Sequence, residues 1–180
     1  MEPLELDGYN NNLKKHIAEA IDYFPLLKMD PFIPLVNQPK RLLRGPLLPK
    51  ALLDQHKISY EDLLKNNYPI IDVCVEIPYD YLYKGCIVYD ENNVIDWNKV
   101  PYEHRHNNGK GEFGNIVCSH LPQEAKDMDN PILENLRTTY RLFVEYCHFL
   151  KTGEWNLKEY SHGEEGVNEY ERSRMQRKVK

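Results

Sequence analysis

The feature that most constrains the fold is a run of alternating residues at 69–78, PIIDVCVEIP, bounded by a proline at each end. The apolar residues of this run occupy every second position and the others fall between them: Ile71, Val73, Val75 and Ile77 on one side, and Asp72, Cys74 and Glu76 on the other. Successive side chains of a β-strand point to opposite faces of the sheet, so a period of two predicts a strand with one apolar face. We therefore expect a sheet to form around this segment.

Other segments predict the partners of this strand. The segment GCIVY at 85–89 follows a tyrosine-rich turn and precedes a second turn, DENN, so it is expected to pair with 69–78 in an antiparallel meander. Residues 25–50 carry a proline every few positions, which excludes a long helix and allows short edge strands or extended chain. Residues 101–120 contain three glycines and no sustained periodicity, so we expect an irregular loop there, of the kind that carries function.

Two helices are expected to cover the sheet. Near the start, Asn12 can cap a segment with apolar residues at helical spacing, which Pro25 ends. Asn130 and Pro131 are typical of a helix start, and an apolar stripe runs from there to Lys151 before Gly153. Together the segments predict an α+β fold: about four antiparallel strands packed on the 131–151 helix, with an N-terminal helix.

Length and charge limit the classes of protein. The 180 residues allow one domain, predicted at 1–170, followed by a basic tail at 171–180. The formal net charge is −5, and the last nine residues, RSRMQRKVK, hold five positive charges, so the body is more acidic still and is not expected to bind nucleic acid. No run of 18 apolar residues and no signal-peptide order is present. We expect a soluble, cytoplasmic protein that does not bind membranes and whose four cysteines are reduced.

The best candidate for chemistry is Cys118, in the loop-like stretch that also contains His106, Asn107 and Asn108. A thiolate is a strong nucleophile, and at an unperturbed pKa a thiol is only about 3% ionised at pH 7. Asparagine amides can donate to an oxyanion when a thioester carbonyl is attacked, and a histidine can hold the loop through its ring nitrogens. The competing interpretation is that Cys118 is a small buried hydrophobic residue, as are the cysteines at 74, 86 and 147.

Two other patterns occupy the same stretch. The spacing G-x-G-x-x-G at 109–114 matches the dinucleotide fingerprint, but it does not follow a strand or open a helix, which favours a turn. A second pattern offers donors of the kind that zinc prefers: His104, His106, Cys118 and His120. The one-residue gaps within this set are less common in zinc sites than longer gaps, yet a zinc-binding structural protein stays open as an alternative.

The order of these segments resembles the ubiquitin-conjugating enzymes, and more closely their bacterial relatives in ubiquitin-like conjugation operons. The resemblance covers roughly residues 58–170 and is carried by five short motifs in the family's order: VEIPYDYL at 75–82, HNN at 106–108, GNIVC at 114–118, GEW at 153–155 and HGEEGVNEY at 162–170. Asn107 stands where the family has a proline, and Ser119 replaces the usual leucine after the cysteine. Either Asn107 or Asn108 therefore fits the place of the oxyanion partner.

The resemblance implies transfer of a ubiquitin-like modifier in bacterial antiviral defence. Cys118 would accept the modifier as a thioester from an activating enzyme and pass it to an acceptor protein, with Asn108, Asn107 and His106 completing the site. No cofactor is implied, in keeping with the absence of a P-loop pattern. The alternative within the same fold is a catalytically inactive module that only binds a modifier or partner. The HGEEG segment, with His162, Gly163 and Gly166, is interpreted as a structural loop.

Overall fold

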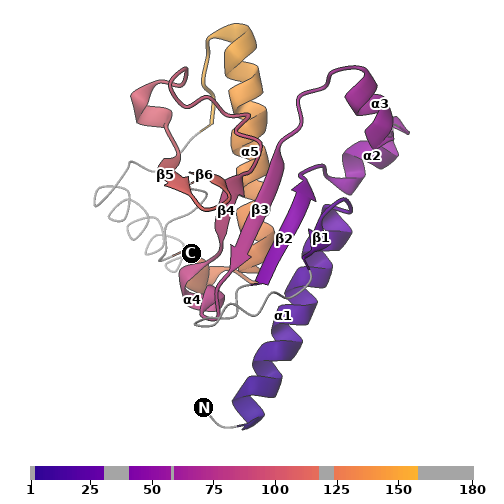
Figure 1. Ribbon diagram of the computed structural model, residues 1–180, viewed down its shortest axis with the longest axis vertical. Helices are drawn as coiled ribbons and strands as arrows, with labels where there is room; N and C mark the ends of the chain where they lie inside the picture. The colour runs from indigo at the N-terminus through magenta and orange to yellow at the C-terminus, as the bar shows by residue number, and fades with distance from the viewer. Residues whose placement is uncertain (1–2, 31–40, 58, 118–123, 158–180) are drawn as a thin grey trace, which may run out of the picture.

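The computed structural model describes residues 3–30, 41–57, 59–117 and 124–157 and shows an α+β fold. The helical elements are α1 (Pro3–Tyr23), α2 (Lys50–His56), α3 (Tyr60–Lys65), α4 (Tyr81–Lys84), the 3₁₀ turns η1 (Tyr102–His104) and η2 (Ala125–Asp127), and α5 (Pro131–Thr152) (Figure 1). The strands are β1 (Lys28–Met29), β2 (Arg41–Pro46), β3 (Asp72–Ile77), β4 (Ile87–Asp90), β5 (Asn107–Gly111) and β6 (Gly114–Val117).

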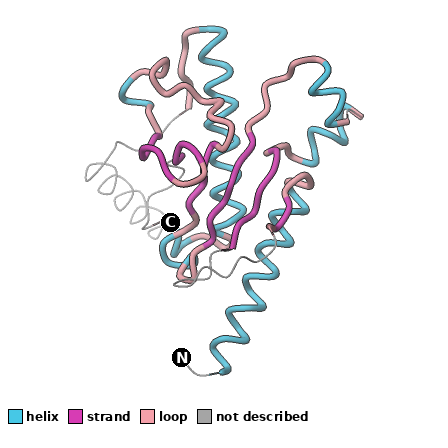
Figure 2. The backbone as a smooth tube through the Cα atoms, viewed as in Figure 1, coloured by secondary structure: helices cyan, strands magenta, loops and turns pink. Residues whose placement is uncertain are grey.

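The six strands form one antiparallel sheet in the order β1-β2-β3-β4-β6-β5 (Figure 2). Strands β1 to β4 form the expected antiparallel meander of four strands, and the hairpin β5–β6 extends the described sheet to six strands with β6, not β5, next to β4. The sequence did not predict the positions of the two-residue strand β1 and of the pair β5–β6. Neither shows the alternation of apolar and polar residues that predicts a strand from sequence.

The apolar face of β3 is buried, as its alternating sequence predicts, but the opposite face is buried too, which the sequence did not predict. The four residues of the apolar face are at most 2% exposed: Ile71, Val73, Val75 and Ile77. They share a core with α1 and α5, which pack against each other. The opposite face is buried as well, with Cys74 at 0% and Glu76 at 8% exposure. Tyr89 donates a hydrogen bond to Glu76 Oε2 at 3.0 Å, and its ring packs edge-on against Phe113, so an aromatic layer covers this second face.

The long helix α5 ends as its sequence predicts. Asn130 Oδ1 accepts a hydrogen bond from the Leu133 amide at 3.0 Å, and Gly153 closes the helix in the left-handed conformation at φ 76°. Helix α1 also ends before Pro25, but it begins at Pro3 rather than near Asn12. The early start was missed because residues 3–11 lack an apolar stripe, which is the signal that marks a packed helix.

The proline-rich region contains more regular structure than expected. Strand β2 is six residues long and lies between β1 and β3, so it is an inner strand and not an edge strand. Its proline is its last residue, where the missing N–H disturbs the ladder least. Helices α2 and α3 follow and close a small separate core with Ile70, which lies just before β3. Helix α3 begins with a capping box between Ser59 and Asp62, a signal present in the sequence but not used in the prediction.

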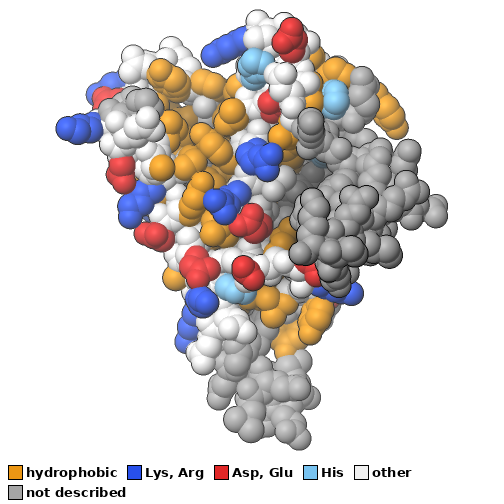
Figure 3. Space-filling view, turned by 180° about the vertical axis from the view of Figure 1, so that it is seen from behind, with side chains coloured by type: hydrophobic (Ala, Val, Ile, Leu, Met, Phe, Trp, Pro, Cys, Tyr) orange, Lys and Arg blue, Asp and Glu red, His pale blue; other side chains and the backbone are white. Residues whose placement is uncertain are grey.

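The helical layer forms the face shown in Figure 3, where hydrophobic side chains gather in a patch over the upper half and charged side chains lie around this patch. Several large apolar residues of α1 and α5 remain partly exposed: Tyr23, Val144 and Leu150, at 37%, 47% and 51%. Within the described part of the chain, no helix combines the length and apolar character needed to cross a membrane.

Candidate functional site

Within 101–120, the stretch expected to be an irregular loop, residues 107–117 form a β-hairpin, so the prediction is wrong there, and residues 118–120 lie outside the described residues. Strands β5 and β6 pair antiparallel around a two-residue turn. Two of the three glycines that suggested a loop are required for close packing instead. A Cβ atom on Gly111 would overlap the Tyr89 ring, and one on Gly114, at φ 135°, would overlap the carbonyl oxygen of Asp90. The glycines therefore let the hairpin lie against β4.

The hairpin brings two parts of the predicted site side by side along the backbone. Asn107 is the register partner of Val117, the last residue of β6. Cys118 follows directly in the sequence and lies outside the described residues, as do the side chains of Asn107 and Asn108. His106 is described, and it immediately precedes β5. The structure thus joins the HNN segment to the chain that leads into Cys118 and leaves the cysteine's own geometry untested.

Arg105 anchors the chain that enters the hairpin. Its Nε donates a hydrogen bond to the Val100 carbonyl oxygen at 2.9 Å, and its guanidinium lies over the Tyr102 ring, 5.9 Å from the centroid. Val100 is buried, at 1% exposure. A charged donor held on a buried carbonyl is a stronger bond than a neutral pair, so Arg105 fixes the direction in which the chain reaches β5.

The histidines on either side of Arg105 each contact a tryptophan. The His106 ring lies 6.5 Å from the ring of Trp97, a core residue only 5% exposed. The His104 ring stacks on Trp155 with centroids 5.2 Å apart and planes within 10° of parallel. Sequence reasoning missed both tryptophans, although the GEW motif contains one of them. His104 is the last residue of the 3₁₀ turn η1 and His106 lies beyond that turn, so the two rings face different tryptophans although they are only two residues apart.

The loop between β4 and η1 supplies the Trp97 wall and is held from two sides. The buried carboxylate of Asp90 accepts hydrogen bonds from the amides of Val94 and Ile95 at 3.0 and 2.8 Å. The Asp96 amide donates to the hydroxyl of Tyr146 on α5 at 3.2 Å. Burial raises the pKa of Asp90, and the backbone amides oppose that shift. The loop is therefore attached to both the sheet and the long helix.

The two competing patterns fare differently. The three glycines of the G-x-G-x-x-G spacing lie in strands β5 and β6, not between a strand and a helix, so the dinucleotide fingerprint lacks its structural context; the glycines are also not the turn that the sequence favoured. Of the zinc set, only His104 and His106 fall within the described residues, where they pack against different tryptophans. Cys118 and His120 lie outside them. Among described residues, no group of three or more His, Cys, Asp or Glu side chains could hold a metal ion.

The other cysteines are poor nucleophiles. Cys74 is fully buried, and burial raises the pKa of its thiol to about 11, against the opposing effect of the Arg44 guanidinium. Cys86 is 4% exposed, and burial raises its pKa as well. Cys147, expected on the core stripe of α5, is only half-buried, although burial still raises its pKa. None of the three is favoured as a thiolate at neutral pH.

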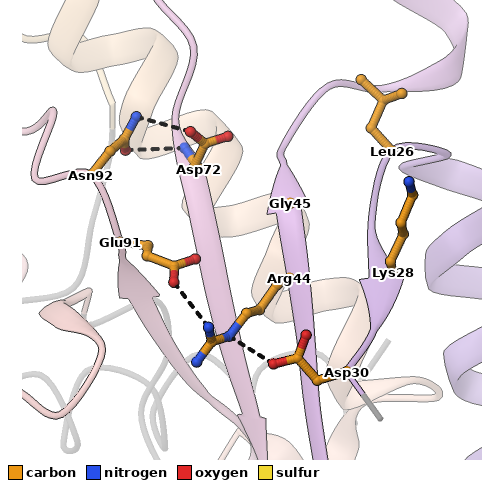
Figure 4. A pocket seen from close by; sticks show the side chains of 8 residues that line it. All are labelled: Leu26, Lys28, Asp30, Arg44, Gly45, Asp72, Glu91 and Asn92. Carbon is orange, nitrogen blue, oxygen red and sulfur yellow. Dashed lines mark hydrogen bonds and ion pairs between the residues drawn. The ribbon is translucent and has the colours of Figure 1, made fainter.

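A cavity of about 400 Å³ opens on the outer face of the sheet, over Gly45 (Figure 4). Its lining combines paired charges and polar groups: Arg44 bridges Asp30 at 3.1 Å and Glu91 at 3.3 Å, while Asn92 Nδ2 donates to Asp72 at 3.3 Å. The described residues that line the cavity include no serine, cysteine or histidine. They offer ionic contacts but no thiol, hydroxyl or imidazole, so the hairpin is the better candidate for thioester chemistry.

No protein-family model, curated protein or solved structure matches this chain. The functional assignment therefore rests on the residues and contacts described above.

Proposed function

We propose that this chain is a conjugating enzyme for a ubiquitin-like modifier, with Cys118 as its nucleophile. The observation that carries the proposal is the register of the hairpin, in which Asn107 pairs with Val117. This pairing sets the two candidate asparagines next to the strand end that leads into the cysteine. The α+β arrangement, with an antiparallel sheet covered by α1 and the long helix α5, agrees with the fold that the sequence resemblance implies.

The reaction proceeds in two acyl transfers. The activating enzyme, using ATP, presents the modifier's C-terminal carbonyl as a thioester on its own cysteine. The Cys118 thiolate attacks that carbonyl, a new C–S bond forms, the bond to the activating enzyme's sulfur breaks, and that sulfur leaves as a thiolate. An acceptor amine then attacks the new thioester, a C–N bond forms, Cys118 leaves as a thiolate, and the amine proton passes to water. Similar pKa values of the two thiols make the first step chemically undemanding.

The remaining site residues act on the oxyanion and on the loop. Each attack places negative charge on the carbonyl oxygen, and a preorganised amide N–H donor at that point contributes roughly 3–4 kcal/mol. Asn108 and Asn107 are the candidate donors. His106, packed near Trp97, holds the start of β5. The site needs no metal and no nucleotide of its own, because the activating enzyme has already consumed the ATP.

A thioester assay tests this proposal with a ubiquitin-like modifier, its activating enzyme and ATP. The wild-type chain is expected to form an adduct one modifier heavier that a thiol reductant removes. Cys118→Ser should form none, or a slow oxyester that resists reductant, because a hydroxyl has a far higher pKa than a thiol. Cys147→Ser is the matched control, since it removes a half-buried thiol elsewhere and should still load.

Two results would reject the enzyme assignment. One is a wild-type chain that never forms the adduct, and the other is a Cys118→Ala variant that still forms it. If the unloaded chain nevertheless binds the modifier, the inactive binding module is the correct interpretation.

A further inference from the structure

The chain that follows α5 folds back toward the candidate site and does not continue outward. Thr152 Oγ1 accepts a hydrogen bond from the Glu154 amide at 3.1 Å, and Glu145, two turns earlier on the helix, accepts one from the Asn156 amide. Together with the left-handed Gly153, these bonds fix residues 153–156 against the end of α5. The GEW motif therefore forms a rigid corner, a role that the conjugation chemistry does not by itself explain.

Trp155 projects from this corner between two elements. On one side its ring lies 6.1 Å from Phe149 of α5 in an edge-on arrangement. On the other side it stacks in parallel on His104, the last residue of η1. Trp155 is half-buried and packs against the main core. It thus connects the end of α5 to the chain that enters β5.

Strand β5 needs such a connection more than the other strands do. It lies at the edge of the sheet and pairs, among described strands, with β6 alone. Its register is interrupted between Asn107 and Lys110, and Gly109 within it has φ 92°. An edge strand with a bulge and few ladder bonds opens more easily than an inner strand. Contacts at the point where the chain enters such a strand then decide how well its first residues are held.

We propose that Trp155 and His104 act as positioning residues, a stacked pair that holds the start of β5 and thereby keeps the backbone of Asn107 in register with Val117, at the strand end that leads to Cys118. The expected effect on modifier transfer rests on the proposed function, whereas the expected effect on the stability of β5 rests on the contacts alone. Helix α5 is the frame, because its other end is capped by Asn130, which also donates a hydrogen bond to the His16 carbonyl of α1 at 3.0 Å.

Hydrogen exchange tests the structural part without any partner protein. In Trp155→Ala, amides of residues 106–110 should exchange at least roughly tenfold faster, while those of β3 keep their wild-type rates. Trp155→Phe retains a stacking ring and should restore most of the protection. Tyr68→Ala is the matched control, since it removes an aromatic ring that is 58% exposed and lies far along the chain from the hairpin. Unchanged exchange at 106–110 in Trp155→Ala would overturn the inference.

Kinetics tests the catalytic part. Trp155→Ala should slow discharge of the modifier roughly 10- to 100-fold, since misplacing a catalytic group by about 1 Å has effects of this size. Loading should change much less, because thioester exchange depends less on the oxyanion donors. Trp155→Phe should recover the discharge rate. His104→Ala combined with Trp155→Ala should be no slower than the worse single variant, since both remove one interaction.

The outcomes separate the two proposals. Discharge at the wild-type rate in Trp155→Ala, or fully additive effects of the two substitutions, would reject the positioning role even if the wild type loads normally. A wild-type chain that never loads would reject the proposed function, while the exchange rates at 106–110 would still decide whether the stacked pair holds β5.

Discussion

Burial sorts the thiols of this chain by reactivity. Alkylation by iodoacetamide needs the thiolate, and burial both blocks access and raises the pKa of a thiol. Cys74 is fully buried with a pKa of about 11, Cys86 is 4% exposed, and Cys147 is half-buried with a raised pKa. Near neutral pH we expect native protein to be labelled first at Cys118, then at Cys147, and last at the two sheet cysteines.

Peptide mass mapping after short labelling times measures this order. In denaturant all four cysteines should react at similar rates, which provides the internal control. Labelling of Cys147 ahead of Cys118 in the native protein would reverse the assignment of the nucleophile.

The two asparagines can be separated by the step that each substitution affects. Replacing the residue that donates to the oxyanion by alanine should slow discharge roughly 10²–10³-fold, with a smaller effect on loading. Asn107 pairs with Val117 in the hairpin, so its backbone position is fixed by the ladder, whereas Asn108 lies within the interrupted part of the register. Single-turnover discharge assays of Asn107→Ala and Asn108→Ala measure the split. Equal losses in both steps would indicate that the asparagine only holds the strand.

At the level of elements, the hairpin shows why glycine-rich sequence misled the prediction. Glycine is a usual sign of turns, so three glycines within 109–114 predicted a loop. The structure uses two of them, Gly111 and Gly114, to let the hairpin approach Tyr89 and Asp90 of β4. Glycine is needed both where the backbone packs closely and where it is flexible, so the sequence alone does not distinguish these two requirements. Only the neighbouring strand distinguishes the two.

Gly114 and Gly109 offer a matched test of that packing. Both have φ in the positive range, at 135° and 92°, so alanine is strained at either position by about 1–2 kcal/mol. Around Gly109 the space is open within 4 Å, whereas a Cβ on Gly114 would overlap backbone atoms of Asp90. We therefore expect Gly114→Ala to lower the free energy of unfolding clearly more than Gly109→Ala. Urea titrations of both variants measure the difference, and equal losses would show that the hairpin does not pack closely on β4.

For the whole molecule, two local sequence signals are enough to predict the fold class, but they do not predict the contacts of the candidate site. The alternation in β3 and the capped stripe of α5 predict a sheet covered by a helix, because each buries one apolar face. The contacts around the hairpin join residues far apart in sequence, such as His104 with Trp155 and Asp96 with Tyr146. No spacing rule relates such pairs, so their proximity depends on the tertiary fold. Helices α2 and α3 were missed because they are short and cover a separate small core.

The stability of the whole chain depends on pH through His16, which lies where α1 contacts α4. This residue is 8% exposed, and its Nδ1 lies 3.0 Å from the hydroxyl of Tyr81 on α4. Burial lowers the pKa of His16 from its ordinary 6.5, although Glu19 opposes this effect and Lys15 adds to it. The unfolded chain therefore takes up a proton at this residue at a higher pH than the folded chain does. The corresponding stability is present above pH 6.5 and is lost as the pH falls below that value.

A variant that cannot titrate isolates this contribution. In His16→Gln the amide replaces the imidazole, so the free energy of unfolding should fall less steeply than in wild type as the pH decreases below 6.5. Burial raises the pKa of Asp72 and Asp90, so their protonation in acid favours the folded state and acts in the opposite direction. Both aspartates are present in both proteins, and their effect cancels in the difference between the two curves. Urea unfolding at a series of pH values gives that difference, and parallel curves would show that His16 is not the group that titrates.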